Sequence, residues 1–448
     1  TEEVIDWIRE QNERVRVEVK QTSFDKLNLW SFKGTPLHLG HDSGKFFTIE
    51  GVRVKTNKKG ISTWDQPIID QPEIGYLGFI VKEIKGVLHF LVQAKIEPGN
   101  VNYVQLSPTL QATNSNYTEV HKGKRPDYLE YFTGVKPENV LLDQLQSEQG
   151  ARFLKKRNRN IIIRTEVDIP IKENFIWVTL AQIKELMQMD NLVNMDTRTV
   201  ISGISYQNIH RVELSGKISN ENIFSQSLFD TSSAVNDFDH IIRFITDRKC
   251  RFELEVEKIG LDKMEQWVLN DNSIHHIDEK YFRVIAVDVE IENREVATWT
   301  QPMIQPAQKG ICAFVCKEIN GVLHFAVQAK LECGNFDVIE FAPTVQALTG
   351  NYRLTGIDNL PFLKYVLNAP KEKVIFDTLQ SEEGGRFYRE QNRNLMVMAD
   401  DSIGEELPEN FIWMTLQQLL MFIRFNNYIN IQARSLLAAI SFTSHGEN

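Results

Sequence analysis

The sequence is poor in cysteine and contains no long apolar run. Its four cysteines, Cys250, Cys312, Cys316 and Cys333, lie in the second half of the 448 residues and lack the spacing of a zinc site or a disulfide framework. We therefore expect reduced thiols in the core. No apolar segment approaches the roughly 18 residues that span a bilayer, and residues 1–20 lack the apolar centre of a signal peptide. These absences predict a soluble cytoplasmic protein that does not bind membranes.

Several well-known motifs are also missing. We find no GxxxxGK[ST], no GxGxxG after a strand, no GxSxG, no HExxH and no paired acidic metal box, which argues against the enzyme classes built on them. The formal net charge is -10, so the chain lacks the basic surface that nucleic-acid binding requires. An anionic ligand would need a local cluster of Arg and Lys, or helix N-termini.

What the sequence does contain is an internal repeat. The segment "GVLHFLVQAKIEPGN" (86–100) returns as "GVLHFAVQAKLECGN" (321–335). At a nearly constant offset, "QSEQGARF" (146–153) returns as "QSEEGGRF" (380–387), and "NFIWVTL" returns as "NFIWMTL". A period of over 200 residues is too long for a solenoid and fits two tandem domains of one fold. We place the first repeat at residues 1–215 and the second at 216–448.

Each repeat mixes helical and strand patterns. Helical spacing is present at 3–12, 138–149, 180–188 and 239–247, where Thr179 is expected to cap the third segment. Period-two alternation predicts strands at 14–20 and 251–258, and two strands within 77–97 around a turn at Lys85-Gly86. These elements predict an α+β fold, with a mixed sheet flanked by helices in each repeat, and not a βαβ dinucleotide fold.

One predicted strand carries an unusual polar end. Along 87–97 one face is apolar, whereas the other changes from apolar residues to Gln93, Lys95 and Glu97. The second copy repeats this with Lys330 and Glu332. Either this end is a solvated sheet face with alternating charges, or it lines a cleft with Gly99 and Gly334 at its rim.

Three further pairs of repeated residues are candidates for ligand binding. Trp64 and Trp299, each followed by Gln-Pro, are either core residues or platforms that stack on a base or sugar. The "QSExGxRF" segments gather small polar groups and an Arg, which suits an oxygen-rich anion, or they simply cap a helix. Arg198 and Arg434 correspond to each other and would serve a diphosphate or a surface carboxylate.

The three repeated segments together resemble the nucleotide-diphospho-hexose 2,3-dehydratases of deoxysugar biosynthesis, over nearly the whole chain. The resemblance implies a homodimer in which each subunit has two domains of Nudix-hydrolase-like topology. It implies dTDP-4-keto-6-deoxy-D-glucose as substrate, loss of the C2 hydroxyl and the C3 proton, and a 3,4-diketo-2,6-dideoxy sugar that passes to a partner 3-ketoreductase. No metal or redox cofactor is required.

The resemblance also assigns roles to residues. The positions expected to bind the nucleotide-sugar, together with the two arginines above, are Trp64, Trp299, Gln146, Ser147, Glu148, Gln149, Gly150, Gln380, Ser381, Gly385 and Arg386. The ketone at C4 acidifies the C3 proton, so one base, one donor to the C4 oxygen and one acid for the C2 hydroxyl are needed. The candidate donors and acids are Lys330, Tyr352 and Arg386, and the candidate bases are Glu332 and Glu382. Their first-half counterparts include Lys95, Tyr117 and Glu148.

Three alternatives stay open at this level. The second half is favoured as the catalytic one because it gains Arg353. The alternative is a site between the domains, with Trp64 from one and Trp299 from the other. The chain could instead be a non-catalytic nucleotide-sugar-binding scaffold. Nudix hydrolysis of a diphosphate is disfavoured, because only Glu382-Glu383 remain of an acidic helix and Gln149 interrupts the other copy.

Overall fold

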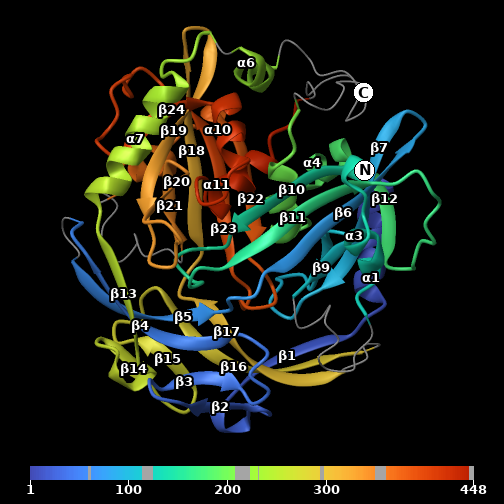
Figure 1. Ribbon diagram of the computed structural model, residues 1–448, viewed down its shortest axis with the longest axis vertical. Helices are drawn as coiled ribbons and strands as arrows, with labels where there is room; N and C mark the ends of the chain where they lie inside the picture. Colours follow the sequence, from blue (N-terminus) through green and yellow to red (C-terminus); the bar gives the residue numbers. More distant parts are fainter. Residues whose placement is uncertain are drawn as a thin grey trace.

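The computed structural model describes residues 1–58, 62–113, 125–206, 222–230, 232–292, 297–348 and 360–442. These ranges form an α+β structure of four sheets and short helices. Figure 1 shows the two larger sheets in the upper part of the molecule and the two smaller ones below them. In the described ranges, no helix has both the length and the apolar character needed to cross a membrane.

The two larger sheets have seven strands each and the same pattern of pairing. The first has the order β10-β11-β6-β7-β12, with β8 on β7 and β9 on β6. Its strands are β6 (Gly75–Ile84), β7 (Val87–Ile96), β8 (Val104–Ser107), β9 (Leu110–Ala112), β10 (Val140–Ser147), β11 (Arg157–Arg164) and β12 (Phe175–Thr179). The second has the order β22-β23-β18-β19-β20, with β21 on β18 and β24 on β19. Its strands are β18 (Gly310–Ile319), β19 (Val322–Leu331), β20 (Ile339–Ala342), β21 (Val345–Ala347), β22 (Val374–Ser381), β23 (Gln391–Met398) and β24 (Phe411–Thr415).

The two smaller sheets exchange strands between the halves of the chain. One contains β2 (Trp30–Lys33), β3 (His38–His41), β4 (Thr48–Thr56), β5 (Thr63–Asp70) and, from the second half, β13 (Leu254–Ile259). The other contains β14 (Trp267–Leu269), β15 (Ser273–His276), β16 (Phe282–Ile291), β17 (Thr298–Pro306) and, from the first half, β1 (Val17–Thr22). Each half therefore completes a sheet of the other. The expected boundary at residue 215 lies outside the described residues.

Short helices border and join these sheets. They are α1 (Glu2–Glu13), α3 (Leu129–Thr133), α4 (Leu180–Leu186), α5 (Met195–Ser202), α6 (Ile223–Phe229), α7 (Phe238–Arg251), α9 (Leu363–Leu367), α10 (Leu416–Ile423) and α11 (Ile431–Ala438). Asn194 and Asn430 cap α5 and α11 in the same way, by accepting a hydrogen bond from a backbone N–H of the first turn. Helix α5 packs on β6 and β11, α11 packs on β18 and β20, and the two helices contact each other between the larger sheets.

The main core is continuous across the two halves. It includes the aromatic pairs Phe79–Phe90 and Phe314–Phe325, with ring centroids 5.5 Å and 5.4 Å apart. A second cluster lies among the smaller sheets, where the Phe153 ring is 5.9 Å from its counterpart Phe387. Because both halves contribute to both clusters, separating them would expose large apolar surfaces to water.

Most local predictions are confirmed. The expected helices at 3–12 and 239–247 are α1 and α7, the strands at 14–20 and 251–258 are β1 and β13, and Thr179 caps α4 through a reciprocal hydrogen-bond pair with Gln182. Strands β6 and β7 form the expected hairpin, in which Lys85 and Gly86 have positive φ angles of 53° and 79°.

Two local predictions are wrong. Residues 138–149 do not form a helix, because most of them lie in β10, which pairs antiparallel with β11. Gly150 and its counterpart therefore follow a strand and not a helix. The four cysteines are free, as expected, but Cys250 is exposed and only the other three are buried.

Candidate active site

Two clefts lie between the halves, and each contains one copy of the repeated polar strand end. The carboxylate cleft, of about 120 Å³, is lined by Gln71, Gly75, Leu77, Lys95, Glu97, Gln111, Ala112, Thr113, Glu148, Phe153, Lys156, Asn158, Asp196, Glu383 and Arg386. The aromatic cleft, of about 460 Å³, is lined by Lys58, Thr63, Trp64, Asp65, Gln66, Ala151, Arg152, Glu265, Gln266, Trp267, His276, Tyr281, Phe282, Lys330, Leu331, Glu332, Gln346 and Leu348.

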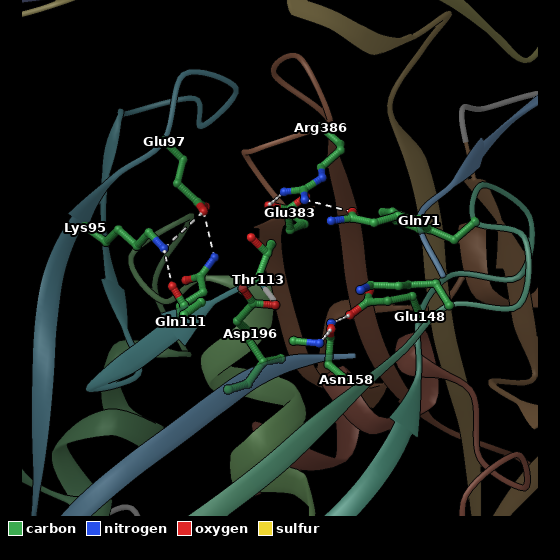
Figure 2. Close-up of a pocket in the computed structure, with 15 residues that line it drawn as sticks. Gln71, Lys95, Glu97, Gln111, Thr113, Glu148, Asn158, Asp196, Glu383 and Arg386 are labelled. Atoms are coloured by element: carbon green, nitrogen blue, oxygen red, sulfur yellow. Dashed lines mark hydrogen bonds and ion pairs between the residues drawn. The ribbon is translucent and has the colours of Figure 1, made fainter. Parts of the chain in front are cut away.

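The end of β7 forms one wall of the carboxylate cleft (Figure 2). Lys95 Nζ lies 4.0 Å from Glu97 Oε1, and Gln111 donates a hydrogen bond of 2.8 Å to the same oxygen. Glu97 is only 4% exposed. The polar strand end therefore lines a cleft and is not a solvated sheet face.

The opposite wall comes from β10 and β11. Asn158 donates a hydrogen bond of 2.7 Å to Glu148 Oε1, and burial raises the pKa of Glu148. Burial and the nearby Arg386 guanidinium lower the pKa of Lys156 to about 8. Groups whose pKa values move towards neutrality are common where protons are transferred.

The second half of the chain completes this cleft with two residues from the segment after β22. Arg386 Nη2 donates to Gln71 Oε1 at 2.8 Å, and Arg386 Nη1 donates to Glu383 Oε1 at 3.3 Å. Burial raises the pKa of Glu383 to about 7, although Arg386 opposes the shift. Figure 2 shows Arg386 and Glu383 between Glu97 on one side and Gln71 on the other.

Helix α5 supplies the remaining ionisable group of the cleft. Asp196 is the second residue of this helix and is 3% exposed. Burial raises its pKa well above the usual range, and the nearby carboxylates of Glu148, Glu383 and Glu97 raise it further. No side chain among the described residues donates a hydrogen bond to the Asp196 carboxyl or forms an ion pair with it.

The aromatic cleft also combines a Lys and a Glu from one half with an Arg from the other half, but the halves are interchanged. Lys330 and Glu332 come from β19, and Gln346 donates a hydrogen bond of 2.8 Å to Glu332 Oε1. Arg152 enters from the first half, with its guanidinium carbon 4.1 Å from the centroid of the Phe282 ring. Burial raises the pKa of Glu332. This cleft also lies between the halves, and of the two predicted tryptophans Trp64 lines it.

Three ionisable residues of the carboxylate cleft are replaced by different side chains in the other repeat. Asp196, Glu383 and Lys156 of the carboxylate cleft correspond to Gln432, Gln149 and Glu390. Gln149 donates a hydrogen bond to Glu382, the counterpart of Glu148. Asn392 also donates to Glu382, whose pKa is raised to about 7, mainly by burial. Glu382 does not line the aromatic cleft.

The Gln and Ser of the repeated segments join the two halves. Ser147 Oγ donates to Glu340 Oε2 at 2.9 Å, and Ser381 Oγ donates to Gln105 Oε1 at 2.7 Å. Gln146 donates to the Ile423 carbonyl and Gln380 to the Met187 carbonyl, at 2.6 Å and 2.8 Å. None of these four predicted binding residues lines either cleft.

The side chains of Arg198 and Arg434 are buried and donate hydrogen bonds to other groups of the protein. Each is 1% exposed, and neither lines a cleft. Arg198 donates to the Ser381 carbonyl and the Gln380 side chain, and Arg434 donates to the Ser147 carbonyl. These hydrogen bonds join each arginine to the other half of the chain, at the two segments that carry residues into the clefts.

The two predicted tryptophans, through the glutamines that follow them, contact the segments that carry Arg152 and Arg386 into the clefts. Trp64 Nε1 donates to Gln66 Oε1 at 2.9 Å, and Gln66 donates to the Ala151 carbonyl at 3.0 Å. Trp299 and Gln301 repeat the arrangement towards Gly385, at 2.8 Å and 2.7 Å. Trp64 lines the aromatic cleft, whereas Trp299 does not line the carboxylate cleft.

Four glycines allow the backbones of the halves to meet beside the clefts. Gly99 N–H donates to the Gly384 carbonyl at 2.8 Å, and Gly334 N–H donates to the Gly150 carbonyl at 2.6 Å. The predicted catalytic residue Tyr352 lies outside the described residues.

Sequence reasoning overlooked Asp196 and Lys156 as cleft residues. The signal that could have found them is their difference from the aligned residues of the other repeat. Among the described residues, no group of three His, Cys, Asp or Glu side chains is placed to hold a metal ion.

Comparison with known proteins identifies the family. The model of the family described as NDP-hexose 2,3-dehydratase matches residues 1–204 and 238–440. A dTDP-4-dehydro-6-deoxy-alpha-D-glucopyranose 2,3-dehydratase of Saccharopolyspora spinosa is 44% identical over 439 residues, covering 97% of this chain and 90% of that protein. Proteins with the same name from Amycolatopsis orientalis and Streptomyces violaceoruber are 40% and 42% identical, cover 98% of this chain, and are covered over 90% and 97% of their own lengths. The chain belongs to the NDP-hexose 2,3-dehydratase family.

Proposed function

We propose that this chain removes the C2 hydroxyl and the C3 proton of dTDP-4-keto-6-deoxy-D-glucose and releases a 3,4-diketo-2,6-dideoxy sugar. The names of its relatives support the substrate. The observation that carries the chemistry is the Lys95–Glu97 pair in a cleft that both halves complete.

Lys95 and Glu97 suit the first step. In a 4-ketohexose the C4 oxygen and the C3 proton are on adjacent carbons, so a cation and a carboxylate 4.0 Å apart can address both at once. Glu97 removes the C3 proton, and Lys95 stabilises the negative charge that develops on the C4 oxygen. Gln111 holds the Glu97 carboxylate in place through its hydrogen bond.

We place this chemistry in the carboxylate cleft of the first half, although the sequence favoured Lys330, Glu332, Glu382 and Tyr352 of the second half. The carboxylate cleft contains Asp196 and Glu383, where the second half has the amides Gln432 and Gln149. An amide does not transfer protons at neutral pH. The carboxylate cleft therefore has four carboxyl groups beside three cations, whereas three carboxyl groups line the aromatic cleft.

The aromatic cleft has the features of a nucleotide-binding site. Its volume of about 460 Å³ is within the range of small-molecule pockets, and the rings of Trp64 and Trp267 offer surfaces for stacking on thymine. Lys330 and Arg152 would hold a diphosphate there. In the carboxylate cleft we assign diphosphate binding to Arg386 and Lys156. We propose that Arg198 and Arg434 do not contact the ligand but hold the segments at Ser381 and Ser147 in place.

The remaining expectations complete the proposal. Each half has Nudix-hydrolase-like topology without Nudix chemistry, the repeats meet near residue 215, and two subunits form a homodimer. The product is unstable, so a 3-ketoreductase of the same pathway consumes it. The four free thiols suit a reducing compartment, and we place the enzyme in the cytoplasm.

Proton NMR tests the proposed reaction. The purified chain is incubated with dTDP-4-keto-6-deoxy-D-glucose, and a 3-ketoreductase with NADPH traps the product. We expect resonances of a C2 methylene. An unchanged spectrum, with the reductase shown to be active on an authentic diketo sugar, would reject the lyase and favour the nucleotide-sugar-binding scaffold. Metal-dependent release of dTMP would instead indicate a hydrolase.

A further inference from the structure

Asp196 lines the carboxylate cleft but takes no part in removing the C3 proton or in stabilising the C4 oxygen. It projects from the start of α5 between the Lys95–Glu97 wall and the Glu148–Asn158 wall (Figure 2). Helix α5 is fixed by its Asn194 cap and by the buried Arg198 in its next turn. The carboxyl is therefore held on a rigid element, as a group that must meet a reacting atom requires.

The surroundings of Asp196 favour the protonated form of its carboxyl group, although Lys95 opposes this. The charged side chains of the cleft are Lys95, Glu97, Glu148, Lys156, Asp196, Glu383 and Arg386. Lys95 is paired with Glu97 at 4.0 Å and Arg386 with Glu383 at 3.3 Å, while Glu148 accepts a hydrogen bond from Asn158. Asp196 has no such partner among the described residues. It is buried beside three other carboxyl groups, and both conditions raise its pKa.

We propose that Asp196 is the general acid that protonates the departing C2 hydroxyl, an inference that rests on the proposed dehydration. Hydroxide is a poor leaving group, so the second step needs a proton at the C2 oxygen. A neutral carboxyl on the cleft floor supplies it, whereas Glu97 must be ionised to accept the C3 proton. Two carboxyl groups in different environments thus take opposite roles.

The step balances without an oxidant or reductant. Glu97 takes the C3 proton and the electrons of that bond form the enolate. The enolate then expels the C2 oxygen, which takes the proton of Asp196 and leaves as water, while a double bond forms between C2 and C3. The resulting enol loses its hydroxyl proton and gains one at C2, giving the 3-ketone. Glu97 releases a proton to solvent and Asp196 takes one up, which restores both groups.

The second repeat shows the same position without this function. Gln432 is the second residue of α11, after the Asn430 cap, as Asp196 is the second residue of α5 after Asn194. Its side-chain amide is buried, and neither of its polar atoms has a hydrogen-bond partner among the described residues. The repeat therefore provides a matched control at an aligned buried site.

Substitution of Asp196 separates the two chemical steps. In Asp196→Asn, which preserves size, we expect water elimination to fall about 10²- to 10⁴-fold, the usual contribution of a general acid. Exchange of the C3 proton with deuterated solvent, followed by NMR, should stay within about 10-fold of wild type because Glu97 and Lys95 are intact. Gln432→Asn should leave both rates within about 3-fold. The inference fails if Asp196→Asn eliminates water at nearly the wild-type rate, or if exchange and elimination fall together.

A substrate analogue gives a second and independent test. Fluoride leaves without a full proton transfer, so the 2-deoxy-2-fluoro analogue of the ketosugar should lose fluoride in Asp196→Asn within about 10-fold of the wild-type rate. Asp196→Glu should regain part of the water elimination. Equal losses with the hydroxyl and fluoro substrates would overturn the assignment. A wild-type enzyme that eliminates neither group would instead refute the proposed function itself.

Discussion

Gly99 is the most informative position at which to disturb the contact between the halves. A Cβ added there would lie 1.8 Å from the Phe387 carbonyl oxygen and 2.6 Å from that of Gly384. These are backbone atoms, so no side-chain rotation relieves the clash. Both hydrogen bonds of the Gly99 backbone, its N–H to Gly384 at 2.8 Å and its carbonyl from Arg389 N–H at 2.7 Å, would be strained or lost.

The expected loss of stability in Gly99→Ala follows from these contacts. Two backbone hydrogen bonds contribute about 1–3 kcal/mol and overpacking costs about 1–3 kcal/mol, so the free energy of unfolding should fall by about 2–6 kcal/mol. Turnover should also fall at temperatures where the variant is folded. The displaced segment is the one that brings Glu383 and Arg386 into the carboxylate cleft.

Urea denaturation and turnover assays test this expectation against two controls. Gly334→Ala meets the Phe153 carbonyl oxygen at the same 1.8 Å and should lose similar stability, but it disturbs the segment of Arg152 and should spare more turnover. Gly134→Ala would meet only the Glu130 carbonyl at 3.7 Å and should be nearly neutral. A Gly99→Ala variant within about 0.5 kcal/mol of wild type would refute this packing of the halves.

Three further predictions follow from buried or cleft-lining groups. Arg198→Ala leaves the Ser381 carbonyl without its buried donor, so urea denaturation should show a loss of about 3 kcal/mol, with KM unchanged in the enzyme that remains folded. Burial raises the pKa of Glu390 from 4.5 to about 7, so the folded chain holds this proton more tightly and stability falls as pH rises from 4.5 through 7. Glu390→Gln should flatten that fall between pH 5 and pH 8, and an unchanged slope would contradict the burial argument. Trp64→Ala should weaken dTDP binding at the aromatic cleft about 5- to 150-fold in calorimetry, from a stacking contribution of about 1–3 kcal/mol, whereas Trp299→Ala should not.

Predictions that depend on local sequence were the successful ones. The hairpin of β6 and β7 follows from the turn at Lys85-Gly86, and the cap of α4 from Thr179 with Gln182 three residues later. Residues 138–149 show the limit, because their apolar spacing fits a helix as well as a strand. Antiparallel pairing with β11, the next strand along the chain, decides in favour of the strand.

The strand exchange could not be predicted from the repeat. Two copies of one unit predict two self-contained sheets, yet β1 pairs with β16 and β13 with β4. The sequences of β1 and β13 specify alternating strands but not which half they join. The choice depends on how the chain crosses between halves, which no local pattern records.

The candidate site residues were predicted because they are present in both copies of the repeat. The polar strand end fits a solvated sheet face as well as a cleft, because charged residues next to apolar ones need either water or a polar cavity, and the fold places it in a cleft. Asp196 was overlooked because "NMDTRTV" reads as an ordinary capped helix. Its meaning depends on the burial of the Asp carboxyl beside Glu97, Glu148 and Glu383, which only the folded arrangement creates.

The central claim is that the carboxylate cleft, and not its counterpart, carries out the reaction. The most direct measurement compares the turnover of Glu97→Gln and Glu332→Gln, which remove the same group from aligned positions of the two repeats. The account predicts that Glu97→Gln loses at least about 100-fold in turnover together with C3 proton exchange, while Glu332→Gln stays within about 3-fold of wild type. Loss of turnover in Glu332→Gln with an active Glu97→Gln would contradict it and move the chemistry to the second half.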